Sequence, residues 1–334
     1  MTATIKDVAL KAGVSVATVS RVLNGTAKVS DDAREAVLKA QRELGFYLNA
    51  NARTLAKKDS DTIGILVSDI SDPYFASMIK SCDVLANSMG KHLLITQGFY
   101  DPIREHKALD SLLSHKCSGL ILHVLGLNDD VLSDYMKRFP QIVLINRYLE
   151  GFEHRCVNID NEDAMYSVVS YLIENGHKKI AYITSSFNIK DANDRLEGYK
   201  KALREHNLPI DEDLIIKSQP SLEGGAKAAK ELLSLGVDRF TAVACYSDSI
   251  AASAMSTFEH NGIQVPKQVS FTGFDDLFLS SCLNPALTTV TNPIEKMGAG
   301  ALKLSLALRN NDNSYKIETF KTELIKRNSV EKLN

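Results

Sequence analysis

One short segment near the start of the chain carries polar side chains at a spacing that could contact a nucleic acid. At 100° per residue, residues 16–23 turn Ala17, Ser20 and Arg21 to one side and three larger apolar residues to the other. A helix face with a guanidinium, a hydroxyl and a small side chain could enter the major groove of DNA. Helical hairpins with a glycine turn also occur in ordinary helical domains, so a purely structural role stays open at this point.

Two short helices joined by a three-residue turn must position this face. Apolar residues recur at helical spacing after Thr4, which is placed as the N-cap, with Asp7 as the reciprocal acid of a capping box. Gly13 ends this helix, and Ser15 can cap the next one. Residues 4–24 therefore predict a helix-turn-helix.

Charge is divided unevenly along the chain. Residues 1–58 hold ten Lys or Arg and five Asp or Glu, a net of +5, whereas the remainder holds 29 against 36, a net of −7. A basic head on an acidic body suits phosphate binding by the head, because counterion release rewards local positive charge. An ordinary solvated surface is the alternative, but the basic excess coincides with the predicted helix-turn-helix, which favours DNA binding.

Two further segments follow the helix-turn-helix. Residues 29–45 predict a third helix, with Ser30 as its cap, two aspartates at its positive end and an apolar stripe. Residues 48–58, LNANARTLAKK, are good helix formers with almost nothing to bury, and a helix so short is marginal alone. They are a candidate for folding on DNA, with a plain interdomain linker as the open alternative.

Composition bounds the remaining function classes. A chain of 334 residues with 44% hydrophobic content indicates two or three domains with ample core. Its start lacks the pattern of a signal peptide, and no apolar run approaches the roughly 20 residues of a membrane span, so we expect a cytoplasmic protein without a membrane partner. Five scattered cysteines without a CxxC pair indicate neither a zinc ribbon nor a disulfide framework.

From residue 62 onward, candidate strands alternate with amphipathic helices at roughly the 30-residue spacing of βαβ units. Mostly apolar strands predict an α/β fold with parallel sheets covered on both faces, and their number suits two doubly wound lobes. Ligands in such sheets bind beyond the carboxyl ends of the strands, so we expect a cleft between the lobes. The candidate strands are TIGILVSDI, HLLITQGF, GLILHVL, QIVLINR, CVNID, KKIAYITS, LIIKS, FTAVACYS, VSFTGF and LTTVT.

No catalytic constellation is visible in the sequence. The chain has no GxxxxGK phosphate loop, GxSxG elbow, HExxH or Cys/His cluster, so we expect no enzymatic activity, no metal and no cofactor. A solute-binding protein of a sugar transporter shares the two-lobed fold and is the alternative from another functional class. The basic head and the lack of a signal peptide argue against it.

Longer motifs occur in a fixed order along the chain, namely IKDVALKAGVSVATVSRVLNG, NANARTLA, SDPYFASMIK, LINRYLEGFEHRCV, ENGHKKIAYI, DRLEGYKKAL, DRFTAVACYSDSIAASAM, GFDD and LTTV. In this order and spacing the whole chain resembles the lactose/galactose-repressor (LacI/GalR) family of bacterial transcription regulators, and within it the galactose repressor and isorepressor branch. The resemblance implies a three-helix DNA-binding head, a hinge helix and a periplasmic-binding-protein-like core of two doubly wound lobes.

The resemblance also implies where the domains begin and end. The chain would cross between the lobes near Asp160, Val290 and residues 320–324. The family core dimerises, and the ending TELIKRNSVEKLN contains no heptad segment for a tetramer, so we expect a homodimer. The expected parts are the head at 1–47, the hinge helix and linker at 48–61, an N-lobe at 62–160 plus most of 291–334, and a C-lobe at 161–290.

For the head, the resemblance implies contacts with double-stranded, pseudo-palindromic operator DNA. Val16 and Ala17 match the family's reading positions, and both are too short and apolar for bidentate hydrogen bonds with a base edge, although they can touch a thymine methyl. Leu55 matches the hinge leucine that wedges into the central minor groove. The expected DNA-contacting residues are Thr4, Ser15, Val16, Ala17, Thr18, Ser20, Arg21, Asn24, Asn49, Ala52, Arg53 and Leu55.

For the cleft, the resemblance implies a small, galactose-like sugar as effector. Arg195 matches the family's ligand-clamping arginine and Asp275 the acid that accepts from sugar hydroxyls, because a guanidinium fork and a carboxylate at strand ends bind vicinal hydroxyls directionally. An interlobe salt bridge between the two is the structural alternative. The expected effector-binding residues are Tyr74, Phe75, Asn146, Asp160, Arg195, Ser247, Asp248, Asp275 and Asn292.

The sequence therefore predicts a sequence-specific transcription regulator, a repressor whose operator affinity is controlled by a sugar bound between two lobes. A regulator of the same family that responds to a purine or to a partner protein is the alternative within this class. Ser247, where relatives often carry Asn, and Asn292, at a variable ligand-facing position, leave the identity of the sugar open.

Overall fold

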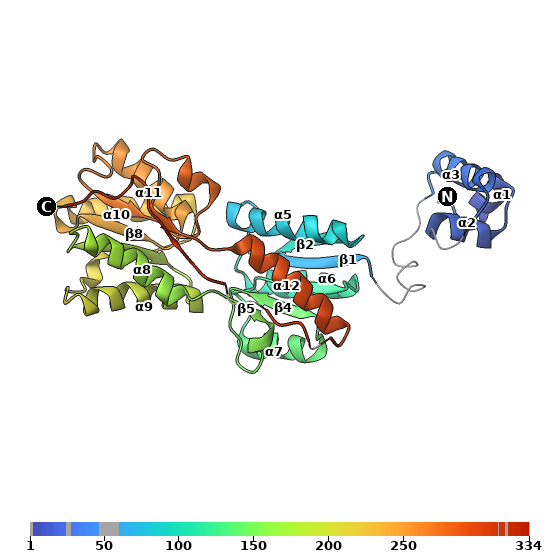
Figure 1. The fold of residues 1–334 in the computed structure, drawn as a ribbon, viewed down its shortest axis with the longest axis horizontal. Helices are drawn as coiled ribbons and strands as arrows, with labels where there is room; N and C mark the ends of the chain where they lie inside the picture. Colours follow the sequence, from blue (N-terminus) through green and yellow to red (C-terminus); the bar gives the residue numbers. More distant parts are fainter. Residues whose placement is uncertain (1–2, 25–27, 47–59, 313, 318–319, 334) are drawn as a thin grey trace. The chain divides into compact units, whose positions relative to one another are not determined.

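The computed structural model describes residues 3–24, 28–46, 60–312, 314–317 and 320–333, and these form two compact units, Met1–Asp61 and Thr62–Asn334 (Figure 1). We call them the head and the core. The described part of the head holds three helices, α1 (Ile5–Ala12), α2 (Val16–Asn24) and α3 (Asp31–Leu44). The predicted hinge helix falls within residues 47–59, which lie outside the described residues.

Local sequence signals set the ends of the head helices. The Thr4 hydroxyl accepts a hydrogen bond from the Asp7 amide, while the Asp7 carboxylate accepts from the Thr4 amide at 2.8 Å, so the predicted capping box is present. Gly13 ends α1 with φ +67°, a left-handed conformation that suits glycine. Ser15 Oγ accepts from the Thr18 amide at 3.1 Å and caps α2. The helix-turn-helix prediction is confirmed.

The N-lobe of the core is built on a five-stranded parallel sheet in the order β2-β1-β3-β4-β5. Alternate residues of β1 face opposite sides: Ile63 and Ile65 pack under helices α5 and α12, whereas Leu66 packs under α6 and α7. The elements are β1 (Thr62–Val67), α5 (Pro73–Ser88), β2 (His92–Gln97), α6 (Pro102–Ser114), β3 (Gly119–Leu122), α7 (Asp129–Arg138), β4 (Ile142–Ile145), η1 (Glu153–Arg155), β5 (Cys156–Val157) and the late helix α12 (Ile294–Arg309).

The C-lobe repeats this arrangement around a four-stranded parallel sheet in the order β7-β6-β8-β9. Helices α8 and α9 pack together on one face and α10 and α11 on the other, so both faces are covered as the apolar strands predict (Figure 1). The elements are α8 (Asn161–Glu174), β6 (Ile180–Ser185), α9 (Lys190–Glu205), η2 (Glu212–Leu214), β7 (Ile215–Ser218), α10 (Leu222–Leu235), η3 (Val237–Arg239), β8 (Ala242–Cys245), α11 (Asp248–His260), β9 (Ser270–Thr272) and η4 (Phe278–Ser281).

Three segments run between the lobes. Asp160 caps α8 after β5, and β10 (Thr289–Val290) leads from the C-lobe toward α12 and pairs antiparallel with β11 (Leu324–Ile325). The residues after β11 return to the C-lobe, where the Phe271 amide donates to the Ser329 carbonyl at 2.8 Å. We expected most of residues 291–334 in the N-lobe, and the part of this range after β11 lies in the C-lobe instead.

Amphipathic helices lie between the strands, as the alternation in the sequence predicts. Helix α7, for example, buries Leu132, Tyr135 and Met136, which recur at helical spacing. The α/β class with a helix-turn-helix head and a two-lobed parallel-sheet core is confirmed.

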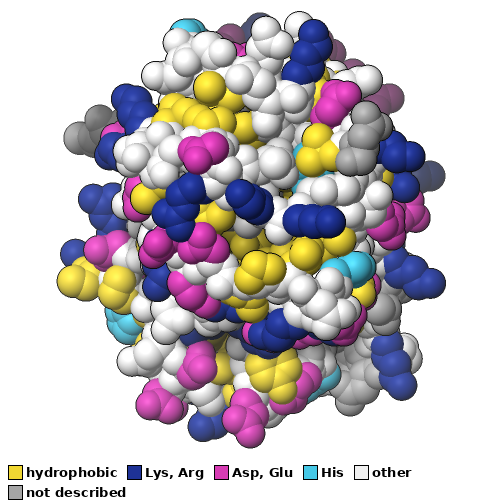
Figure 2. Space-filling model, turned by 90° about the vertical axis from the view of Figure 1, so that its left-hand side faces the viewer, with side chains coloured by type: hydrophobic (Ala, Val, Ile, Leu, Met, Phe, Trp, Pro, Cys, Tyr) yellow, Lys and Arg dark blue, Asp and Glu magenta, His cyan; other side chains and the backbone are white. Residues whose placement is uncertain are grey.

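The surface adds two observations. At the outer end of the C-lobe, cationic and anionic side chains are interspersed, so this face shows no continuous basic surface (Figure 2). The excess of Lys and Arg over Asp and Glu instead falls within residues 1–58. Among the described helices, none is both long and apolar enough to span a lipid bilayer.

Candidate DNA-binding face and interlobe cleft

The face of α2 is oriented as its spacing predicts. Ala17 and Arg21 are exposed, Val16 is 41% exposed, and Val19 is fully buried in the three-helix core. Thr18 and Ser20 are half-buried, Ser15 and Thr4 are exposed at helix starts, and Asn24 ends α2. The other expected DNA contacts, Asn49, Ala52, Arg53 and Leu55, lie outside the described residues.

A cleft between the lobes encloses about 500 Å³ of space not filled by atoms, part of it open to solvent. It lies beyond the carboxyl ends of β3, β4, β6, β8 and β9, where the strand reasoning places a ligand. Six of the nine expected effector-binding residues line it: Tyr74, Phe75, Asn146, Arg195, Ser247 and Asp275.

Arg195 stands in the second turn of α9, not at a strand end as we expected, and its long side chain reaches the strand ends instead. Its guanidinium is buried and held by several groups: Nε donates to Asn161 Oδ1 at 2.8 Å, and Nη1 donates to the Tyr246 carbonyl at 2.6 Å. The Phe274 ring lies 3.5 Å from Cζ. These contacts fix the Arg195 guanidinium in the C-lobe.

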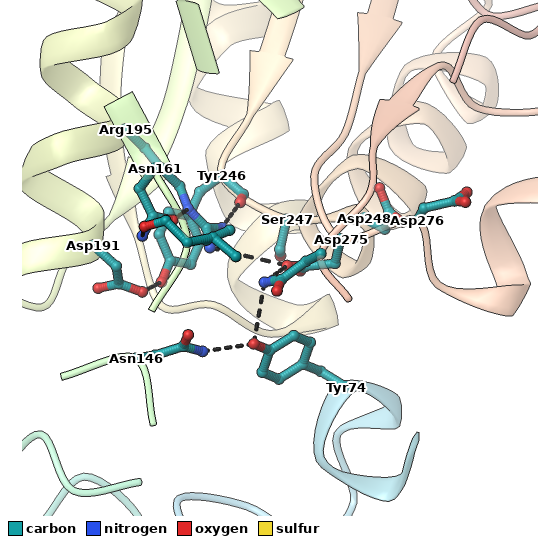
Figure 3. Close-up of polar contacts among 12 residues, drawn as sticks. Tyr74, Asn146, Asn161, Asp191, Arg195, Tyr246, Ser247, Asp248, Asp275 and Asp276 are labelled. Atoms are coloured by element: carbon teal, nitrogen blue, oxygen red, sulfur yellow. Dashed lines mark hydrogen bonds and ion pairs between the residues drawn. The ribbon is translucent and has the colours of Figure 1, made fainter. Parts of the chain in front are cut away.

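Arg195 Nη2 and Asp275 Oδ1 are 3.9 Å apart (Figure 3). Both residues belong to the C-lobe, since α9 and the segment after β9 pack on the same sheet, so the alternative of an interlobe salt bridge is wrong. This distance is longer than the hydrogen bonds of a bidentate Arg–carboxylate pair. A ligand hydroxyl can therefore bridge the two groups.

Asp275 is held in a strained and desolvated state. Its φ is +106°, a conformation that non-glycine residues rarely adopt, and such strain clusters at functional sites. Burial raises the pKa of Asp275 to about 7, opposed by the nearby Arg195 and by a hydrogen bond from Asn292. The free carboxylate therefore lacks some of the stabilisation that water would give it, and a hydroxyl donor in the cleft would supply it.

A chain of amides crosses the cleft at Tyr74. Asn146 Nδ2 donates to the Tyr74 hydroxyl at 2.6 Å, and Asn292 Nδ2 donates to the same oxygen at 3.1 Å and to Asp275 Oδ1 at 3.0 Å (Figure 3). The Oδ1 atoms of both asparagines are buried without a hydrogen-bond partner. Unpaired buried acceptors are costly, so they mark places for a ligand donor.

Three expected residues do not line the cleft. Asn292 lies behind Asp275 and Tyr74 and orients them through its amide. Asp248 is fully buried, where it accepts hydrogen bonds from the Leu277 amide and the Thr289 hydroxyl, so its role is to hold the segment after β9. Asp160 caps α8 by accepting from the Asp163 amide at 2.9 Å and faces a separate hollow. None of these three side chains lines the cleft in this arrangement, and their contact with an effector stays a prediction.

The remaining two predicted residues form walls. Phe75 is buried, and its ring contacts the edge of His123 with centroids 4.6 Å apart. Ser247 Oγ accepts from the Ile250 amide at 3.4 Å, so this hydroxyl caps α11 at the rim of the cleft. Both side chains serve local packing as well as the cleft.

Several cleft residues were missed by the sequence reasoning. Asp191 lies four residues before Arg195 on α9, and its carboxylate accepts from the Tyr246 hydroxyl at 2.6 Å. Their spacing on one helix face could have revealed the acid. His123 and Tyr246 follow strands β3 and β8 directly, which is where ligands of open α/β sheets bind. The others are Asp72, Tyr100, Leu125, Ile189, Pro220 and Ser249.

The cleft offers a guanidinium, three carboxylates and the unpaired amide oxygen of Asn146 between aromatic walls. This mixture suits a compact, polyhydroxylated ligand, which presents many donors and acceptors on an apolar ring. Within the part of the chain that the structure describes, no three His, Cys, Asp or Glu side chains form a group suited to a metal ion.

Comparisons with known proteins find relatives of both the head and the core. Residues 4–49 match the lacI family of bacterial regulatory proteins, and residues 169–330 match a periplasmic binding protein-like domain. The chain is 44% identical over 329 residues to the HTH-type transcriptional regulator GalR of Escherichia coli K12, which covers 98% of this chain and 96% of GalR.

Two solved structures are similar along almost the entire chain. One is the lac repressor dimer bound to operator and the anti-inducer ONPF, with a TM-score of 0.83, 26% identity and coverage of 99% of this chain and 100% of that one. The other is the complex of the transcriptional regulator CelR with cellobiose, with a TM-score of 0.71, 28% identity and coverage of 98% and 99%.

Proposed function

The chain belongs to the LacI family of bacterial regulatory proteins and is a DNA-binding transcription regulator rather than an enzyme; we propose that a galactose-like sugar bound between its lobes controls its affinity for operator DNA. The family membership predicted from the sequence motifs is thereby confirmed. The identity of the sugar, the dimer and the contacts with DNA are parts of the proposal.

One observation carries the sugar site. Arg195 Nη2 and Asp275 stand 3.9 Å apart, in a cleft lined by Asn146, whose amide oxygen lacks a partner. A sugar with vicinal hydroxyls can accept from the guanidinium and donate to the carboxylate at once, with a further hydroxyl available to the Asn146 amide. The 44% identity to GalR supports a hexose of the galactose type as the first candidate.

The head is the part of the chain that would contact DNA. The exposed Arg21 and half-buried Thr18 and Ser20 would contact phosphates or a guanine, while Val16 and Ala17 touch bases only through apolar contact. One head with such short reading residues discriminates weakly. Specificity would then depend on two heads at a fixed spacing and on Leu55 in the minor groove.

The regulator would work as a homodimer, as the lac repressor does on its operator. Two heads would occupy successive major grooves of a pseudo-palindrome, in the cytoplasm and on the nucleoid when bound. Sugar binding would move the N-lobes and disfavour the paired hinge segments. A coupling of about 1–3 kcal/mol, typical of such switches, gives roughly a 5- to 150-fold loss of operator affinity.

Operator titrations test the proposal directly. Labelled DNA carrying candidate pseudo-palindromes is titrated with the full-length protein in the presence of D-galactose, other hexoses, disaccharides, purines or no additive. We expect galactose or a near relative to lower operator affinity, with the other compounds inactive. If no sugar changes the affinity, sugar control is wrong, and a response to a purine would establish the alternative within the family.

The variant Arg195→Ala separates the two sites. It should abolish the response to sugar and leave operator binding without sugar unchanged, because Arg195 contacts only groups of the core. The matched control is Arg204→Ala on the same helix, where the side chain is half exposed and pairs with Glu197 outside the cleft. Loss of operator binding in Arg195→Ala alone would assign that arginine to the stability of the core.

A further inference from the structure

The loop that follows β3, residues 123–128, forms part of the cleft wall. His123 and Leu125 line the cleft from this loop, and the His123 ring contacts Phe75. The His123 amide still donates to the Leu66 carbonyl of β1 at 2.8 Å, and the Asn128 carbonyl accepts from the Leu132 amide of α7 at 3.1 Å. Between these two ends, residues 124–127 have no regular secondary structure, so other groups must bind their backbone.

A single buried carboxylate binds the amides of this loop. Glu105 lies on α6 and has no exposed surface. Its Oε1 accepts from the amides of Leu125 and Gly126, both at 3.0 Å, and its Oε2 accepts from Gly126 at 2.9 Å and from Leu127 at 2.8 Å. Three consecutive amides thus donate to one carboxyl group, which is a strong and directional arrangement.

A guanidinium binds the carbonyls of the same loop from its other side. Arg147 Nη1 donates to the Val124 carbonyl at 2.9 Å, and Nη2 donates to the Leu127 carbonyl at 2.7 Å and to Asp129 at 2.6 Å. Arg147 directly follows Asn146, which itself lines the cleft. The two charged side chains together replace the missing regular hydrogen bonds.

Close packing joins Glu105 to a second part of the cleft wall. A Cβ on Gly98 would overlap Glu105 Cγ, and a Cβ on Gly126 would lie 2.8 Å from the backbone nitrogen of Pro102. Residues 98–101 carry Tyr100, which also lines the cleft. The carboxylate therefore sits where the turn bearing Tyr100 and the loop bearing His123 meet.

We infer that Glu105 is a positioning residue for ligand recognition: it does not line the cleft, but it fixes the part of the loop that places Leu125 against the ligand. This inference rests on the proposed function, because the ligand is the sugar of that proposal. The hydrogen bonds of the carboxylate go to the loop, whereas His123 is held separately by the Leu66 carbonyl and the Ser68 hydroxyl. Replacement of Glu105 should therefore change ligand affinity through Leu125.

The variant Glu105→Gln tests this role with little change in volume. A glutamine presents two N–H donors where the loop presents only donors, so at least one loop amide loses its acceptor. In hydrogen–deuterium exchange of the ligand-free protein, we expect faster exchange at residues 124–127 and unchanged exchange in the C-lobe sheet. Affinity for D-galactose, measured by calorimetry, should fall at least about tenfold.

Two comparisons distinguish positioning from general destabilisation. In a double-mutant cycle, Glu105→Gln should cost little further affinity once Leu125 is replaced by alanine, since the first change acts through the second residue. The control Asp110→Asn lies on the same helix, half exposed and bonded to Tyr135 away from the cleft, and should leave affinity and loop exchange unchanged. Operator binding without sugar should stay within about twofold in all variants.

The outcomes separate the inference from the proposed function. Unchanged exchange at residues 124–127 in Glu105→Gln, or strictly additive effects in the cycle, would overturn the inference. If the parent protein binds no sugar of the panel, the proposed function is wrong, while the exchange measurement still decides whether Glu105 fixes the loop. Should Glu105→Gln not fold, Arg147→Met removes the carbonyl contacts of the same loop and must show the same exchange pattern.

Discussion

The ring of Tyr100 in the N-lobe stacks on the ring of Phe187 in the C-lobe, with centroids 4.4 Å apart and planes inclined by 23°. Tyr100 has a left-handed φ of +57°, so the backbone is strained where it presents this ring. Among the described aromatic pairs, this one alone joins the two lobes. It lies at the mouth of the cleft, where Tyr100 lines both the cleft and an outer hollow.

Removal of either ring should weaken the sugar complex, because the stack favours the arrangement in which both lobes face the ligand. An aromatic pair contributes about 0.5–1.5 kcal/mol beyond its buried area, so Tyr100→Ala and Phe187→Ala should each lower sugar affinity by about 2- to 10-fold. Calorimetry on both single variants and the double variant measures the coupling. Independent, additive losses would show that the stack does not hold the lobes together.

Sugar affinity should rise with pH until about pH 7 and then level off. Burial raises the pKa of Asp275 to about 7, so the empty cleft binds a proton there at lower pH, with Asp72 and Asp191 nearby adding to the shift and Arg195 opposing it. A carboxylate is the better acceptor for a hydroxyl, so each pH unit below 7 should cost up to about tenfold in affinity. Calorimetry between pH 5.5 and 8.5 checks the slope.

The matched variant for this pH dependence is Asp275→Asn. It should bind sugar weakly at every pH, with no slope around neutrality, because no proton is then exchanged at that position. Affinity that rises as the pH falls would contradict the assignment of Asp275 as the acceptor.

Asp248 should matter for stability rather than for sugar contact. Its carboxylate accepts from the Leu277 amide at 2.8 Å and from the Thr289 hydroxyl at 2.7 Å, and alanine would leave both buried donors unpaired. We expect Asp248→Ala to lower the free energy of unfolding of the core by about 2–4 kcal/mol in denaturant titrations. Asp160→Ala, which removes an exposed helix cap, should cost only about 1 kcal/mol. Equal losses would refute a buried structural role for Asp248.

Arg21 should contribute to DNA binding through phosphate charge. Arg21→Ala should weaken binding to operator and to random DNA alike, and reduce the slope of log affinity against log salt by about 1. Fluorescence anisotropy between 50 and about 200 mM salt measures that slope. Arg42→Ala is the control, since this side chain lies on α3 and donates to the Leu38 carbonyl of its own helix. A loss confined to operator DNA would instead assign Arg21 to reading a guanine.

Local sequence signals predicted much of this fold. The caps at Thr4, Ser15 and Ser30 and the glycine at position 13 act within four residues of themselves, so their effects are visible without tertiary structure. The apolar strands likewise indicated parallel sheets, because a strand that is apolar on both sides belongs in a sheet covered on both faces, as parallel sheets are. Helical spacing is equally local: in α7 the buried residues Leu132, Tyr135 and Met136 stand at i, i+3 and i+4.

The sequence by itself determined the helix-turn-helix and the two doubly wound lobes, because local spacing suffices for these, and its resemblance to the LacI/GalR family implied Arg195 and Asp275 as cleft residues. Only the tertiary structure decided that Asp191 faces the cleft while Asp160 and Asp248 do not. All three are acids near helix starts in the sequence. Which acid reaches the ligand depends on how each helix packs on its sheet, and that depends on contacts between residues far apart in the chain.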